Sequence, residues 1–151
     1  MKYSLEQLTN SDIKLFNQLL DCFEQVFNEP HNYGSHVRPD KDYIQSLLAD
    51  KTFIALVALD NDKVIGGLTA YEYKKYEQPR SEIYIYDLAV YEDYRKQGVA
   101  TALINQLKPI AKERGAWVII VQADKGDTAP INLYTKLGKR EDIHHFDIPV
   151  D

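Results

Sequence analysis

Residues 87–100, with the sequence DLAVYEDYRKQGVA, decide the fold of this chain. The segment begins as the apolar end of a strand, turns through charged residues and opens a helix, whose outward N–H groups and dipole favour negative charge. Small residues at Gly98 and Ala100 leave those amides open to a phosphate group. Arg95 and Lys96 add positive charge beside them. The segment predicts a phosphate-binding helix entry, although a charged helix entry without a ligand has the same pattern.

Hydrophobic periodicity around this segment predicts an alternation of strands and helices. Strands are expected over residues 3–8, 52–59, 63–73, 81–90, 116–122 and 144–148. Helices are expected over residues 13–27, 41–48, 98–113 and 128–137, and the turn formers of residues 28–40 predict a loop. This order predicts an α/β (α+β) fold, which is a mixed sheet with helices on its faces.

Four local features add finer expectations. Gly66-Gly67 predicts a bulge or a close backbone approach inside its strand. The nearly continuous apolar run of residues 116–122 predicts a strand that is covered on both faces. Pro109 is expected to kink or shorten its helix, and Asp127 is expected to cap the last one.

Length and composition limit the possible functions. The chain has 151 residues, which predicts one domain over residues 1–151. With 18 Lys and Arg against 23 Asp and Glu, the formal net charge of -5 argues against nucleic acid and membrane partners and permits a cationic one. Cys22 is the single cysteine and no histidines have zinc-type spacing, so neither a disulfide nor a metal site is expected. The sequence has no secretion signal and no membrane-spanning run, which makes the reducing cytoplasm the expected location.

The segment at residues 87–100 resembles the acetyl-coenzyme A loop of the GNAT N-acetyltransferase superfamily. The family pattern is Arg or Gln, two residues, Gly, one residue, and Gly or Ala, which Arg95, Gly98 and Ala100 match. The resemblance implies a single mixed sheet whose central strands splay apart and hold acetyl-coenzyme A in the gap between them.

A second motif strengthens this resemblance. Residues 132–138, NLYTKLG, are similar to the family helix that carries an Asn near the pantetheine and a Tyr near the sulfur. One departure is Lys139, because many members have an aromatic residue after the glycine. The residues implied for cofactor binding are Leu88, Ala89, Val90, Arg95, Lys96, Gln97, Gly98, Val99, Ala100, Thr101, Asn132 and Tyr134.

A narrower resemblance concerns the acceptor. Residues 78–90, together with shorter stretches between residues 40 and 148, are similar to the aminoglycoside 3-N-acetyltransferases of the GNAT type. This implies acetyl transfer to the 3-amino group of a deoxystreptamine antibiotic such as gentamicin, hence resistance, and a homodimer. It also implies that Asp87 lies at the reactive amine.

Tyr134 and Asp87 suit the two proton transfers that such a reaction needs. A phenol of reference pKa about 10 is protonated at neutral pH and can donate to the departing thiolate. A carboxylate of reference pKa about 3.9 is a weak base for an ammonium near 10, but burial raises the first value and neighbouring ammonium groups lower the second. We therefore expect Asp87 to orient the amine and accept its proton, directly or through a water. Without the motif, the same residues read as a core tyrosine and a strand-end aspartate.

The acceptor groove is expected to be acidic, because its substrate is cationic. The candidates beside Asp87 are Glu82, Asp124, Asp127, Glu141, Asp142 and Glu29, although each alone is also compatible with a solvated surface charge. Tyrosines at positions 71, 73, 76, 84 and 86 alternate in the strands and are expected to pack, with stacking on a sugar ring as the alternative.

Other functions remain open on the sequence alone. The same cofactor site can serve a polyamine, an amino sugar or a peptide amine. A non-catalytic acyl-coenzyme A sensor is disfavoured by Tyr134 and Asp87, and an enzyme that acetylates charged transfer RNA is disfavoured by the net charge of -5.

Overall fold

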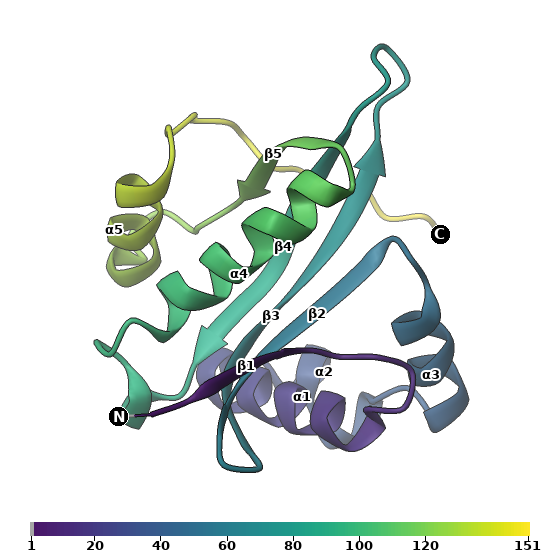
Figure 1. Ribbon diagram of the computed structural model, residues 1–151, viewed down its shortest axis with the longest axis vertical. Helices are drawn as coiled ribbons and strands as arrows, with labels where there is room; N and C mark the ends of the chain where they lie inside the picture. The colour runs from purple at the N-terminus through teal and green to yellow at the C-terminus, as the bar shows by residue number, and fades with distance from the viewer. Residues whose placement is uncertain (1) are drawn as a thin grey trace.

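The computed structural model describes residues 2–151, whose centre is a five-stranded sheet (Figure 1). In sheet order the strands are β1 (Ser4–Gln7), β2 (Phe53–Asp60), β3 (Lys63–Lys74), β4 (Ser81–Val90) and β5 (Ala116–Val121). The strands β1 to β4 pair antiparallel, whereas β5 pairs parallel with β4. The predicted mixed sheet is therefore confirmed.

Helices cover both faces of this sheet. They are α1 (Ile13–Phe27), α2 (Pro30–Tyr33), α3 (Lys41–Ala49), α4 (Val99–Glu113) and α5 (Thr128–Leu137), with 3-10 turns at Ser35–Val37 and Glu92–Tyr94. In Figure 1, α4 crosses in front of the sheet and α1 lies behind it. The loop expected over residues 28–40 is partly wrong, because α2 and one 3-10 turn form there.

The two faces of the sheet have separate apolar clusters. One gathers around Leu103 and Leu107 of α4, and the other around Leu19 and Phe23 of α1. Strand β2 supplies both, since its alternate side chains point to opposite faces. All residues from Phe53 to Leu59 are consequently buried.

The paired glycines of β3 fit the close approach predicted for them. A Cβ at Gly67 would lie 2.5 Å from the carbonyl oxygen of Leu56 and 2.6 Å from a methyl group of Leu19. The register between β2 and β3 also shifts beside this pair, between Ala58 and Leu59. Of the two alternatives expected for this pair, the close approach is found, and a register shift lies beside it.

Three local expectations need correction. The strand β5 is not covered on both faces, because it is an edge strand with Trp117 53% and Ile120 36% exposed. Helix α4 runs from Val99 to Glu113, so Pro109 does not shorten it, and the kink expected as the alternative stays a prediction. Pro109 lies on the exposed side, where water can replace the lost backbone donor. The last helix begins after Asp127 as expected, but the Asp127 side chain makes no capping hydrogen bond.

The strand expected over residues 144–148 is wrong as well. Residues 138–151 are exposed throughout and none of residues 139–151 has regular secondary structure. A strand needs a neighbouring strand for its backbone hydrogen bonds, and no strand among residues 2–151 pairs with this segment. The apolar side chains of this segment therefore alternate as in a strand, but no strand among residues 2–151 pairs with it.

Candidate active site

The candidate site lies at the carboxyl ends of β4 and β5, which meet at one edge of the sheet because the two strands are parallel. Their pairing begins at Ser81 and ends where Ile85 faces Val121. Strand β4 continues to Val90, whereas β5 stops at Val121. The outer edge of residues 88–90 is consequently unpaired and available to an extended ligand.

The predicted strand residues of the cofactor site lie along this unpaired edge. On their other side Leu88, Ala89 and Val90 pair with residues 66–68 of β3. The side chains of Ala89 and Val90 are buried, so their backbone groups are what the site offers. This arrangement fits an acyl-pantetheine chain that adds to the sheet as a short strand.

The N-terminus of α4 follows directly and fits a pyrophosphate. Gly98 has φ +79°, and a Cβ there would meet no atom within 4 Å, so the approach to the first helical amides is open. No side chain of the described residues caps this end of the helix. Arg95 donates from Nε to the Val90 carbonyl oxygen at 3.0 Å, which places its guanidinium at the end of β4. Lys96 and Gln97 are exposed beside it.

The rest of the predicted cofactor set lies on α4 and α5. Val99 is buried and serves the apolar core, whereas Ala100 and Thr101 in the first turn of α4 are half-buried. Asn132 is exposed on α5. Tyr134 is half-buried on the same helix and packs against the α4-side apolar cluster. Burial, with a smaller contribution from the charge of Asp127, raises the pKa of Tyr134 to about 12, so the phenol stays protonated.

Asp87 occupies a break in the regularity of β4. The register with β3 shifts between Thr69 and Ala70, which face Asp87 and Ile85. The bulged backbone turns the Asp87 side chain toward the α1 face, where the Tyr33 hydroxyl of α2 donates a hydrogen bond to Oδ2 at 2.8 Å.

The surroundings of Asp87 raise its pKa. Burial has the largest effect, the hydrogen bond from Tyr33 opposes it, and the negative charge of Glu29 adds to it. A carboxylate with a raised pKa is a better proton acceptor than an exposed one. The sequence does not predict this contact, because residues 28–40 contain only turn signals and Asp87 lies 54 positions from Tyr33.

The predicted acidic residues do not form one cluster. Glu82 is already paired, since it accepts hydrogen bonds from Lys75 Nζ at 2.9 Å and Trp117 Nε1 at 3.2 Å. Asp124 and Asp127 are exposed in the loop between β5 and α5. The remaining two, Glu141 and Asp142, are exposed in the C-terminal segment.

The tyrosines of β3 and β4 form a continuous aromatic row beside Asp87. Tyr73 stacks on Tyr84, Tyr84 packs edge-on against Tyr86, and Tyr86 packs edge-on against Tyr71. Tyr73 and Tyr86 are more than half exposed, so packing accounts for only part of their surface. Tyr76 lies apart from the row and is fully exposed.

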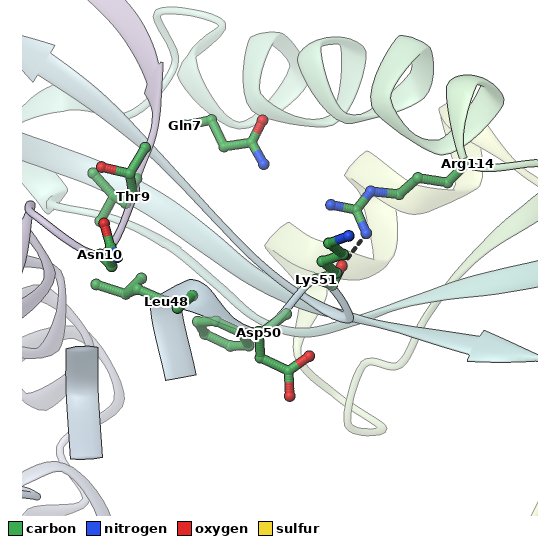
Figure 2. Close-up of a pocket in the computed structure, with 10 residues that line it drawn as sticks. Gln7, Thr9, Asn10, Leu48, Asp50, Lys51 and Arg114 are labelled. Atoms are coloured by element: carbon green, nitrogen blue, oxygen red, sulfur yellow. Dashed lines mark hydrogen bonds between the residues drawn. The ribbon is translucent and has the colours of Figure 1, made fainter. Parts of the chain in front are cut away.

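A hollow of about 500 Å³ lies elsewhere, at the opposite end of α4 (Figure 2). It is lined by Gln7, Thr9, Leu48 and Asp50, among others, and Arg114 reaches across it to the carbonyl oxygen of Lys51. Arg114 also pairs with Glu72 at 3.0 Å, which ties the end of α4 to β3. None of the predicted site residues lines this hollow.

Among residues 2–151, no three His, Cys, Asp or Glu side chains gather in a way that suits a metal ion. In the same residues, no helix has the length and apolar character needed to cross a membrane.

The fold and the site together define an acetyltransferase of the GNAT class. The acetyltransferase (GNAT) family matches residues 14–139, and the chain belongs to this family. The chain is similar to an aminoglycoside acetyltransferase from an uncultured soil metagenomic sample, with 48% identity, a TM-score of 0.96 and 100% of both chains covered. A second such enzyme, whose structures contain sisomicin or trehalose, is 32% identical with a TM-score of 0.91 over 99% of this chain and 97% of that one.

A curated relative from a eukaryote matches a shorter part of the chain. N-alpha-acetyltransferase 30 of Schizosaccharomyces pombe is 34% identical over 87 residues, which are 56% of this chain and 55% of the relative. The chain spans about half the length of the curated relatives it matches.

Proposed function

We propose that the protein transfers an acetyl group from acetyl-coenzyme A to the 3-amino group of a deoxystreptamine aminoglycoside of the gentamicin type. The observation that carries this proposal is Asp87, a half-buried carboxylate near the carboxyl end of β4, the strand that leads into the open helix entry at Gly98. The similarity of the chain to two aminoglycoside acetyltransferases over nearly its whole length supports this acceptor class. Acetylation replaces an ammonium by a neutral amide, which is the proposed basis of resistance.

The chain's own residues divide the work of the reaction. The first turn of α4 and Arg95 hold the pyrophosphate, and the outer edge of residues 88–90 aligns the pantetheine arm. Acetyl-coenzyme A, the usual acyl donor of the family, supplies an activated thioester when bound. Holding the amine against that thioester can supply roughly 7–11 kcal/mol of the barrier.

Two side chains carry the protons. Asp87 accepts the proton of the acceptor amine, whose nitrogen forms the new bond to the acetyl carbon. Tyr134 donates its phenolic proton toward sulfur as the carbon–sulfur bond breaks. The raised pKa of Asp87 reduces the difference between its pKa and that of the acceptor ammonium, which makes proton transfer to Asp87 less unfavourable. The raised pKa of Tyr134 keeps its phenol protonated and able to donate.

A second candidate is acetylation of another amine, either a small polyamine or amino sugar, or a peptide amine. The similarity to N-alpha-acetyltransferase 30 favours the peptide form of this alternative. It predicts the same roles for Asp87 and Tyr134 and a different acceptor surface.

The partners and the compartment belong to the same proposal. We propose that residues 1–151 form one domain and that two copies of the chain form a homodimer. The dimer is proposed because the apolar side chains of residues 143–150 are exposed in the single chain. Asp87 and Glu29 are proposed as the main acidic contacts for the acceptor, because Glu82 is already paired with Lys75. A reducing cytoplasm suits the single free, buried thiol of Cys22.

The test is thioester consumption with a panel of amines. We expect turnover with gentamicin and sisomicin, and we expect NMR of the product to place the acetyl group on the 3-amino nitrogen. Spermidine, glucosamine and short peptides with free N-termini represent the alternative acceptors. Turnover of one of these without turnover of any aminoglycoside would overturn the proposal.

A further inference from the structure

We propose that Tyr33 is a positioning residue for Asp87, which fixes the direction in which this carboxylate meets the acceptor amine. This inference rests on the proposed role of Asp87 as proton acceptor. It assigns a function to residues 29–33, a segment whose sequence predicts only a loop.

The contact between Tyr33 and Asp87 leaves one carboxylate oxygen for the acceptor. The Tyr33 hydroxyl donates to Oδ2 at 2.8 Å, whereas Oδ1 has no hydrogen-bond partner among residues 2–151. A carboxylate held through one oxygen cannot rotate freely about its terminal bond. Its second oxygen therefore keeps a fixed direction in which to meet an amine.

The ring of Tyr33 is held in place by aromatic side chains of α1. It packs against Phe23 at 5.9 Å and against Phe27 at 5.3 Å, both on α1. The following residue, Gly34, has no room for a side chain, since a Cβ there would lie 2.4 Å from the Pro30 carbonyl oxygen. The tight turn and the aromatic anchor together fix the hydroxyl in space, as expected for a group that orients another.

Charged and titratable groups surround Asp87 from three elements. Tyr33 and Glu29 approach from the α2 turn, Tyr71 from β3 and Tyr84 from β4 itself. Of these, Tyr33 stabilises the ionised carboxylate by its hydrogen bond, and Glu29 destabilises it by its charge. The α2 turn therefore acts on Asp87 in two opposite directions.

Two conservative variants separate these effects. Tyr33→Phe keeps the aromatic packing and removes only the hydroxyl, so the pKa of Asp87 rises and the acidic limb of the kcat/KM profile moves to higher pH. The expected loss at the acidic end is roughly three- to ten-fold. Glu29→Gln moves the same limb to lower pH, and added salt abolishes this second shift because Glu29 is exposed.

The carboxyl resonance of Asp87, followed by carbon-detected NMR in the full chain, tests the inference without any acceptor. Opposite displacements of its titration in Tyr33→Phe and Glu29→Gln support the inference, even if no aminoglycoside is acetylated and the proposed function fails. Tyr3→Phe, at a half-buried tyrosine outside the site, is the matched control and leaves the titration unchanged. An unchanged Asp87 titration in Tyr33→Phe would overturn the inference, whether or not aminoglycosides are turned over.

Discussion

At the residue scale, Asp87 is expected to lower the folding stability at high pH, in the same ionised form that the reaction needs. Because its pKa is raised in the folded chain, Asp87 favours folding less and less as the pH rises through that folded value. Asn at this position does not ionise and can still accept the Tyr33 hydrogen bond. We expect Asp87→Asn to unfold at a higher urea concentration than the native chain at pH 8, and at a similar one at low pH.

The same variant is expected to lose turnover. Without a proton acceptor, kcat should fall by about 100-fold or more, which steady-state kinetics at pH 8 measures. Turnover within a few-fold of the native chain would contradict the proposed role. Loss of both turnover and folding stability would mean that the substitution disturbs the structure instead.

Tyr134 makes a second prediction at this scale. Its pKa of about 12 keeps the phenol protonated throughout the neutral range, so it should add no limb to the pH profile there. Tyr134→Phe is expected to lower kcat by about 100-fold with little change in KM for acetyl-coenzyme A. Tyr3 packs against the same apolar cluster, and Tyr3→Phe should leave both constants unchanged. A large rise in KM with an unchanged kcat would indicate a binding role only.

At the element scale, the two ends of α4 offer a matched pair of glycines. Gly98 has φ +79° and Gly115 has φ +78°, and a Cβ at either position meets no atom within 4 Å. Alanine at each position should therefore cost a similar free energy of unfolding, about 1–2 kcal/mol. Only Gly98→Ala adds a methyl group where the pyrophosphate is expected.

We expect Gly98→Ala to raise KM for acetyl-coenzyme A by about 10-fold or more and Gly115→Ala to leave it unchanged. Isothermal titration with coenzyme A and urea unfolding of both variants measure the two effects separately. Equal affinities for coenzyme A would exclude the helix entry as the phosphate site.

The elements also show what local sequence can and cannot predict. Helix α1 was predictable because Leu19 and Phe23 recur at helical spacing and face a single cluster. The contact from Tyr33 to Asp87 spans 54 positions, and no local pattern encodes it. The strand expected at residues 144–148 failed for a related reason: an alternating pattern is local, but the strand that it must pair with is not.

At the scale of the whole molecule, the exposed C-terminal segment argues for a second copy of the chain. Ile143, Phe146, Ile148 and Val150 are 65%, 80%, 84% and 102% exposed. The last three alternate as in a strand, and β5 is an edge strand with Trp117 half exposed. Pairing of this segment with β5 of a second copy would bury these side chains, each worth roughly 1.5–3 kcal/mol.

Deleting residues 141–151 should therefore convert the proposed dimer to a monomer in sedimentation experiments. Because the deletion also removes Glu141 and Asp142, a full-length variant, Phe146→Asp with Ile148→Asp, serves as the sharper comparison. The deletion and the double variant are each expected to weaken association at least about 100-fold. The deletion removes the apolar contacts, and the double variant puts charges in their place. Tyr76→Asp alters a fully exposed aromatic residue outside this segment and should leave the dimer intact. A native chain that sediments as a monomer, or a truncated chain that still dimerises, would show that this segment does not join two copies.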